Sequence, residues 1–183
     1  KNLTENFVSG IILLLEASIR PGDVLLVEGE LVKVKEMGIR STVVRTRDGD
    51  ALILPNSMLV SDAVRNFSLG RALHRVHAVV GVSYDSDMEQ VYRVLEDTAL
   101  DFPEASELRP PLVLMTGFGD NSVNFEVHVW IEDSWSRRIL VSQLHRALWR
   151  SLRRAGVTIA FPQIDVHLDA EVTSSLSKLS AIS

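Results

Sequence analysis

The chain has 183 residues, 46% of them hydrophobic and 23% charged, so it can bury a core in one domain or in two small ones. Nineteen basic residues stand against 24 acidic ones, and the net charge of −5 argues against a nucleic-acid binder that works by neutralising phosphates. The absence of cysteine excludes disulfides, thiolate metal sites and a cysteine nucleophile, and it suits a reducing compartment.

The first predicted element is an amphipathic helix over residues 2–19. Its apolar stripe recurs every four positions and consists of Leu3, Phe7, Ile11 and Leu15. Pro21-Gly22 is the predicted stop, and the apolar stretch is far shorter than the ~20 residues that span a bilayer. The helix is either an ordinary first helix packed on a domain or the end of a longer helix. The abrupt start at Lys1 favours the second interpretation.

Five short strands are predicted next, at residues 23–28, 31–37, 39–46, 51–54 and 63–67. Asp48-Gly49 predicts a type I′ hairpin turn, which needs two residues that tolerate positive φ. Pro55 ends the fourth strand, and Asn56-Ser57 can start a helical turn. This spacing predicts a small barrel with a docking loop at Pro55.

The second half of the chain predicts the order β-α-β-β-α-β. Its strands are at residues 73–82, 112–118, 123–131 and 157–168, and its helices are at 88–100 and 135–155. Ser86 and Glu89 predict a capping box, and Gly156 stands where a C-terminal helix cap needs positive φ. With right-handed crossovers this order predicts a ferredoxin-like split βαβ sandwich, followed by a patternless tail at 169–183.

The helix predicted at 135–155 concentrates positive charge, because no acid occurs between Ser134 and Ile164. Its arginines are Arg137, Arg138, Arg146, Arg150, Arg153 and Arg154. Trp149 falls on the polar face of this helix, which indicates a subunit contact. The arginine face is either solvated, paired with acids of a neighbouring subunit, or placed to bias the ions in a vestibule. The sequence does not choose among these alternatives.

In this order, the elements resemble the small-conductance mechanosensitive channel (MscS) family over residues 1–168. The motifs that carry the resemblance are Arg20-Pro21-Gly22-Asp23, Thr46-Arg47-Asp48-Gly49, Leu54-Pro55-Asn56-Ser57, Asn66-Phe67-Ser68, Tyr84-Asp85-Ser86-Asp87, Gly119-Asp120-Asn121-Ser122-Val123 and Phe161-Pro162-Gln163-Ile164-Asp165-Val166. None of them is specific alone, and their order makes the resemblance.

The resemblance implies an α+β chain in four parts. Residues 1–20 would be the amphipathic end of a pore helix, 21–67 a five-stranded Sm-like β-barrel domain, 68–168 a ferredoxin-like α/β domain, and 169–183 a tail. The whole protein would be a homoheptamer in the inner membrane, reaching the bilayer through upstream segments. This part would face the cytoplasm and form the vestibule of a channel that opens under tension and releases ions and small osmolytes.

The resemblance also implies two sets of contact residues. The contact that couples the pore helix to the β domain would involve Asn6, Gly10, Pro55, Asn56 and Ser57. Residues 161–168 of the last strand would pair with their copies in a parallel barrel between subunits. The alternating apolar residues of this strand, which join Trp149 as predicted interface residues, are Ile164, Val166 and Leu168.

Two other functional classes compete with the channel. A soluble oligomeric ligand- or RNA-binding module fits the two small folds, although net acidity counts against RNA. An enzyme is not expected, because Gly81-Val-Ser83-Tyr-Asp85 lacks the second glycine of a nucleophile elbow and no convergent catalytic set is apparent. The histidines show no ligand spacing, and Asp85 and Asp87 suit a helix N-terminus, so no metal or cofactor is expected.

Overall fold

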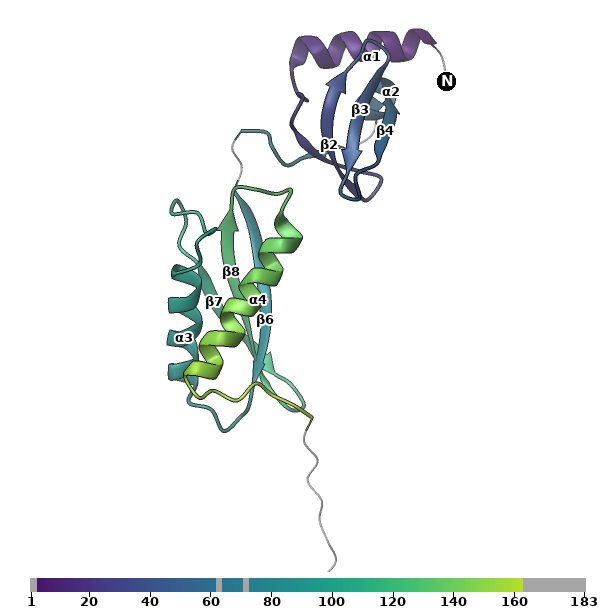
Figure 1. Cartoon of the computed structure of the whole chain (residues 1–183). Helices are drawn as coiled ribbons and strands as arrows, with labels where there is room; N and C mark the ends of the chain where they lie inside the picture. Colours follow the sequence, from purple (N-terminus) through teal and green to yellow (C-terminus); the bar gives the residue numbers. More distant parts are fainter. Residues whose placement is uncertain (1–2, 62–63, 71–72, 163–183) are drawn as a thin grey trace, which may run out of the picture.

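The computed structural model describes residues 3–61, 64–70 and 73–162, which form two units in chain order (Figure 1). The first unit contains α1 (Leu3–Glu16), β1 (Val24–Val27), β2 (Glu30–Met37), β3 (Ser41–Thr46), β4 (Ala51–Pro55), α2 (Asn56–Ser61) and β5 (Arg65–Asn66). The second contains β6 (His74–Val82), α3 (Met88–Leu100), β7 (Leu112–Phe118), β8 (Val123–Ile131) and α4 (Arg137–Arg154). The chain is therefore α+β.

The first unit is built on an antiparallel sheet in the order β4-β3-β2-β1-β5. Alternation along the strands puts every second side chain on one face, so that Val32, Val34 and Val44 are buried together. A bulge between Val34 and Glu36 bends the second strand. Among the described residues the two edge strands, β4 and β5, do not pair, so no hydrogen bonds between them close the sheet into a barrel.

The hairpin between β3 and β4 differs from the predicted type I′ turn. Only Gly49, at φ +98°, has positive φ in this loop. The Gly49 N–H donates to Thr46 O over 3.2 Å, and the Thr46 N–H donates to Asp50 O over 2.9 Å. This is a three-residue loop that closes with one left-handed residue, so the prediction of a two-residue turn was wrong.

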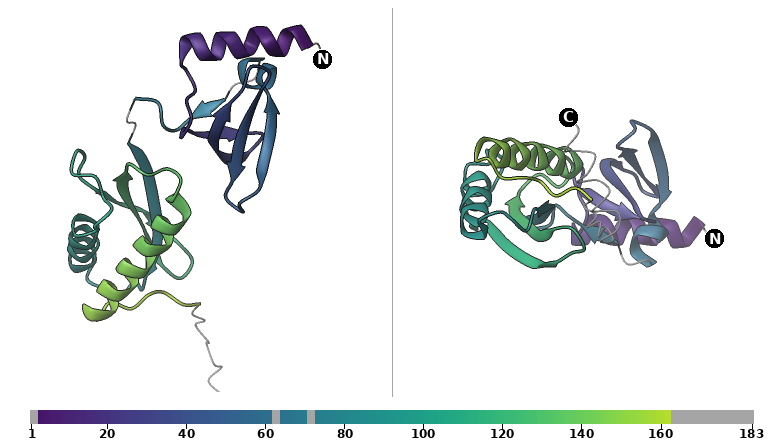
Figure 2. Two further views of the ribbon diagram at one scale, coloured as in Figure 1. Left: turned by 45° about the horizontal axis from the view of Figure 1, so that its top comes forward. Right: turned by 90° about the horizontal axis from the view of Figure 1, so that it is seen from below.

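Helix α1 lies across one end of the sheet, beside α2 (Figures 1 and 2). It ends at Glu16, before the predicted stop, because Ala17 adopts φ +50°. Its buried residues are Ser9, Gly10 and Leu13. The apolar stripe of the helix is exposed, with exposed fractions of 70%, 47%, 40% and 81% at Leu3, Phe7, Ile11 and Leu15. The face that contains Ser9 and Gly10 packs against the first unit, because these small residues permit a close approach.

In the second unit α3 and α4 cover one face of a sheet in the order β6-β8-β7 (Figure 2). The core between them includes Val91 and Leu95 of α3, Leu144 and Leu148 of α4, and Phe125 of β8, all fully buried. The leucines of α4 recur every four positions and form its buried stripe, and the helix begins at Arg137 rather than at the predicted residue 135.

The cap of α3 corrects another prediction. Asp87, rather than Ser86, is the N-cap, and its Oδ1 accepts from the N–H groups of Glu89 and Gln90 over 2.9 and 3.2 Å. The predicted capping box is therefore wrong by one residue. A carboxylate at this position satisfies two free N–H groups and faces the positive end of the helix dipole.

The end of α4 is closed by Gly156 at φ +73°, as predicted. The Gly156 N–H donates to Arg153 O and the Val157 N–H to Leu152 O, the pattern of a Schellman cap. Over its described part, the strand predicted to begin at Val157 is reduced to a single bridge between Ile159 and Val82. Hydrogen bonds from the Ser83 N–H to Thr158 O and from the Ala160 N–H to Gly81 O flank this bridge. Pro162 has no N–H to extend the pairing. The rest of that predicted strand lies outside the described residues.

Candidate functional site

The predicted coupling residues of α1 and of the loop after β4 lie together in the structure. Asn6 Oδ1 accepts a hydrogen bond from the Ser57 N–H over 3.0 Å. Ser57 belongs to the first turn of α2, whose leading N–H groups have no partner within the helix. An α1 side chain therefore supplies an acceptor to the start of α2.

Gly10 is the point of closest approach between α1 and the sheet. A Cβ atom built at Gly10 would lie 2.0 Å from Ile39 O and 2.6 Å from Asn56 Nδ2. The carbonyl belongs to the backbone and cannot swing away like a flexible side chain. Glycine is therefore required here by the approach of the turn between β2 and β3.

Asn56 is fully buried and holds this turn in place. Its Oδ1 accepts from Thr42 Oγ1 over 2.8 Å, and its Nδ2 donates to Gly38 O and Ile39 O over 2.9 and 3.1 Å. The Asn56 N–H donates to Arg40 O over 3.1 Å. One amide side chain thus fixes the carbonyl that Gly10 meets, so Gly10, Asn56 and Ile39 form one connected contact.

Pro55 takes a more peripheral place. It is the exposed last residue of β4, opposite Ser41, and needs no N–H at that edge. Together with Leu3 and Asn6 it lines a cavity of about 310 Å³ between α1 and the sheet.

Thr42 and Ile39 belong to this contact, and the sequence did not single them out. Thr42 stands in a β3 alternation whose other members are apolar or hydroxyl-bearing and buried, and it is itself fully buried. A buried hydroxyl in a strand needs a partner, which was the available signal. Ile39 contributes its backbone carbonyl, and because every residue has one, the residue type does not indicate this role.

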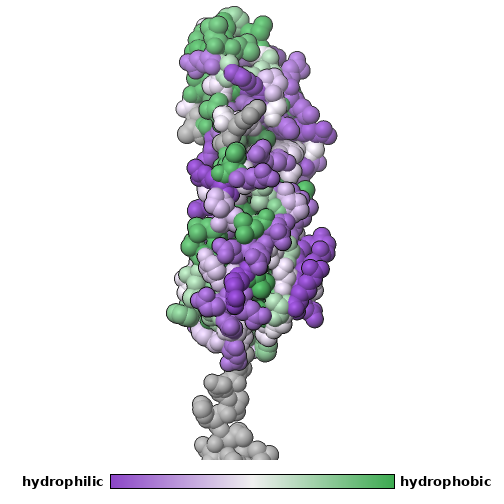
Figure 3. All heavy atoms as spheres, turned by 90° about the vertical axis from the view of Figure 1, so that its left-hand side faces the viewer, coloured by the Kyte–Doolittle hydropathy of each residue, from purple (hydrophilic) through white to green (hydrophobic). Residues whose placement is uncertain are grey.

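The apolar stripe of α1 gathers at one end of the molecule (Figure 3). Other exposed residues of the helix widen it, namely Val8, Ile12 and Leu14. This surface is too apolar to be a simple solvated helix face. In the described part of the chain, no helix is both long enough and apolar enough to cross a membrane.

Trp149 is half exposed, and the Arg153 guanidinium lies 5.2 Å from its ring centroid. It lines a mostly apolar groove of about 380 Å³ between α4 and the edge of β6, with Val79 and Ile159 on the other side. The remaining predicted interface residues, Ile164, Val166 and Leu168, lie outside the described residues.

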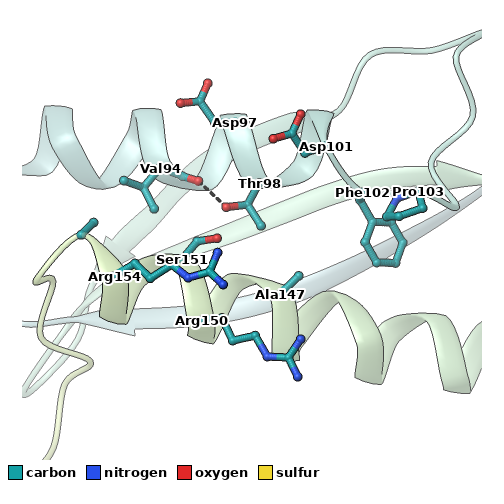
Figure 4. A pocket seen from close by; sticks show the side chains of 11 residues that line it. Val94, Asp97, Thr98, Asp101, Phe102, Pro103, Ala147, Arg150, Ser151 and Arg154 are labelled. Carbon is teal, nitrogen blue, oxygen red and sulfur yellow. Dashed lines mark hydrogen bonds between the residues drawn. The ribbon is translucent and has the colours of Figure 1, made fainter.

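The arginine face of α4 borders a second groove, next to α3 (Figure 4). Arg150 and Arg154 lie along α4, and Asp97 and Asp101 lie along α3, around a hollow of about 550 Å³. No ion pair joins these helices within the described ranges. Acidic side chains of α3 and basic side chains of α4 therefore border the same hollow without pairing.

Histidine and carboxylate side chains are the candidate metal ligands of this cysteine-free chain. Within residues 3–61, 64–70 and 73–162 no three His, Asp or Glu side chains are placed to hold a metal ion. The rings of His77 and His128 lie 5.6 Å apart, and His128 Nε2 is 3.0 Å from Glu126 Oε2. These residues share the sheet face opposite the helices.

Two family models match the chain. One, described as the beta-domain of the mechanosensitive ion channel, matches residues 2–69. The other, described as the C-terminal part of the mechanosensitive ion channel MscS, matches residues 76–159. The two matches occur in this order and together cover most of the chain.

Among curated relatives, the mechanosensitive channel MscK of Escherichia coli is 32% identical over 166 residues, which are 91% of this chain and 15% of that protein. The small-conductance mechanosensitive channel of Edwardsiella ictaluri is 32% identical over 165 residues, 89% of this chain and 56% of that protein. The chain thus spans well under two thirds of the length of both relatives.

Among solved structures, the closed-state MscS of Helicobacter pylori has a TM-score of 0.79 and 26% identity, over 91% of this chain and 65% of that one. MSL1 of Arabidopsis thaliana has a TM-score of 0.68 at 14% identity, over 88% of this chain and 60% of that one, and shares the fold.

Proposed function

Because the chain belongs to the MscS family of mechanosensitive ion channels, we propose that it is the cytoplasmic vestibule portion of a channel subunit. The whole channel opens under membrane tension and releases ions and small osmolytes. Tension favours the state with the larger in-plane area. The observation that carries this proposal is the match of both family models, in family order, over residues 2–69 and 76–159.

The proposal includes a homo-oligomer, with seven subunits, in the inner membrane. Segments upstream of this chain would contact the bilayer, and this part would face the cytoplasm. The exposed apolar stripe of α1 supports this, because such a surface is normally covered by a membrane or another subunit.

Two finer features of the fold belong to the same proposal. The strand order β4-β3-β2-β1-β5 in a bent sheet is compatible with an Sm-like barrel over residues 21–67. The order β6-β8-β7, with the Ile159 bridge on the free edge of β6, is compatible with a ferredoxin-like domain over 68–168. Its last strand would continue into a barrel between subunits through Ile164, Val166 and Leu168, ahead of a tail at 169–183.

We place the coupling between pore and β domain at Asn6, Gly10, Pro55, Asn56 and Ser57. Two contacts support it, because both hold α1 in place: the hydrogen bond from the Ser57 N–H to Asn6, and the close packing of Gly10 against the Ile39 carbonyl. A change in the angle of α1 would break this hydrogen bond and would move Gly10 away from the Ile39 carbonyl. Trp149 would lie at a subunit contact.

Survival of a sudden osmotic downshift tests the function. The intact protein would be expressed in bacteria that lack their own mechanosensitive channels. We expect rescue by the wild type, a changed degree of rescue by Asn6→Ala, and wild-type rescue by Thr4→Ala, an exposed position on the same helix. Failure of the wild type to rescue, at a verified membrane level, would reject the channel proposal.

A further inference from the structure

One side chain joins the two units of the chain directly. Arg47, in the hairpin between β3 and β4, donates from Nη2 to the backbone oxygen of Trp135 over 3.0 Å, across 88 positions of sequence. Its guanidinium carbon also lies 5.9 Å from the centroid of the Trp135 ring. A planar guanidinium can make both contacts at once, which a lysine ammonium cannot do in the same way.

The turn that receives Arg47 is held firmly. Asp133 Oδ1 accepts from the N–H groups of Trp135 and Ser136 over 2.9 and 3.3 Å, just before α4 begins. Lys33 of β2 acts on the same carboxylate from the first unit and helps to lower its pKa. The Trp135 carbonyl is thus presented in a fixed direction toward the hairpin.

The boundary between the units also contains a cavity. It lies beside the Arg47 contact, has a volume of about 640 Å³, and its walls include Lys33, Phe67, Leu108 and Trp135. Chain units that meet through a small, polar boundary move relative to one another unless something fixes them. Arg47 is in a position to do that.

The Arg47 contact is also incompletely satisfied. Its Nε is shielded from solvent and meets no acceptor in the described part of the chain. Docking therefore removes the hydration of one charged N–H while forming the bond through Nη2. The bond through Nη2 stabilises the docked arrangement, and the buried Nε without an acceptor partly offsets that stabilisation.

From these observations we infer that Arg47 is a positioning residue whose contact with Trp135 can form and break. Docked on Trp135, it fixes the orientation of the second unit against the first. When Arg47 is released from Trp135, the two units can change their relative orientation. The inference concerns a contact within one subunit, and it rests on the proposed function only in placing the protein as an oligomer in a membrane.

The test measures the distance between the units in the intact protein in lipid nanodiscs. The chain contains no cysteine, so spin labels can be placed at Glu30→Cys on β2 and Glu96→Cys on α3, both exposed. Dilution with unlabelled subunits keeps each measured distance within one subunit. We expect one main distance in the otherwise wild-type protein and a second, displaced maximum in Arg47→Gln.

Arg45→Gln is the matched control. Arg45 lies at the same hairpin and carries the same charge, but its Nε binds Gly49 O within the first unit over 3.3 Å. Wild-type distances in Arg45→Gln are expected. A single unshifted maximum in Arg47→Gln, or an equal displacement in Arg45→Gln, overturns the inference. If Arg47→Gln does not fold, Arg47→Lys decides in its place, by the same displaced maximum or its absence.

Discussion

At the scale of single residues, the packing of α1 against the turn between β2 and β3 requires a glycine at position 10. We expect Gly10→Ala to destabilise the first unit by about 1–3 kcal/mol, because the new methyl group would overlap Ile39 O. Alanine favours a helix over glycine by up to about 1 kcal/mol, so a net loss isolates the steric effect. Urea unfolding would measure the change.

Ser9→Ala provides the comparison for Gly10→Ala, because Ser9 is the buried neighbour on the same helix. This variant is expected to stay within about 1 kcal/mol of the wild type. If Gly10→Ala were as stable as Ser9→Ala, the close approach of helix and sheet would be contradicted.

Asn56 and Thr42 should behave as a coupled pair. Asn56→Ala leaves the Thr42 hydroxyl and two backbone carbonyls without their buried partner, and we expect a loss of about 2–3 kcal/mol. Thr42→Val removes one hydroxyl and should cost about 1 kcal/mol. The double variant should lose less than the sum in urea unfolding. Strict additivity would show that the two side chains act separately.

The sequence predicted which residues meet at this contact, but not how they meet. The Pro55-Asn56-Ser57 loop and the positions Asn6 and Gly10 came from motifs in a familiar order, and the structure places Asn6, Gly10, Asn56 and Ser57 within one contact. The carbonyl of Ile39 could not be predicted, because any residue can present a carbonyl. The role of the contact in gating stays a prediction.

At the scale of elements, periodicity predicted most helices and strands, but it did not predict which side of α1 faces the sheet. The alternation in β8 and the leucine stripe of α4 mark buried faces, because their apolar side chains leave water and pack on one another. For α1 the pattern left open whether the helix packs on a domain or is the end of a longer helix, and its apolar stripe is exposed in the structure. The residues that are buried, Ser9, Gly10 and Leu13, are not members of that stripe.

The turn before α4 gives a prediction for acid stability. Burial alone would raise the pKa of Asp133, but hydrogen bonds from Ser136 and Trp135, aided by Lys33, hold the pKa below the ordinary value of an aspartate. The folded-state pKa is depressed, so this stabilisation is present above the unfolded pKa. It is lost as the pH falls through the folded pKa.

Asp133→Asn should therefore lose stability at neutral pH, and its difference from the wild type should shrink as the pH falls below about 4. Urea unfolding at a series of pH values measures this. Asp48→Asn, in an exposed hairpin loop, serves as the control and should parallel the wild type. A difference for Asp133→Asn that stayed constant at every pH would contradict the assignment.

At the scale of the whole molecule, Trp149 tests the proposed assembly. Trp149→Ala should weaken association of subunits at least about tenfold, because half-exposed aromatic side chains beside an apolar groove are typical of binding hot spots. Mass photometry of the detergent-solubilised protein over a dilution series measures it. Tyr92→Ala, an exposed aromatic on α3, should dissociate like the wild type. Identical dissociation of both variants would place Trp149 outside the interface.

The central claim is that this chain is part of a channel opened by tension, and a patch-clamp recording tests it most directly. The intact protein would be reconstituted into lipid vesicles, and suction would be applied to excised patches. We predict step-like currents that appear above a reproducible suction and disappear on its release. Patches that contain verified protein and stay silent up to the rupture of the membrane would contradict the claim.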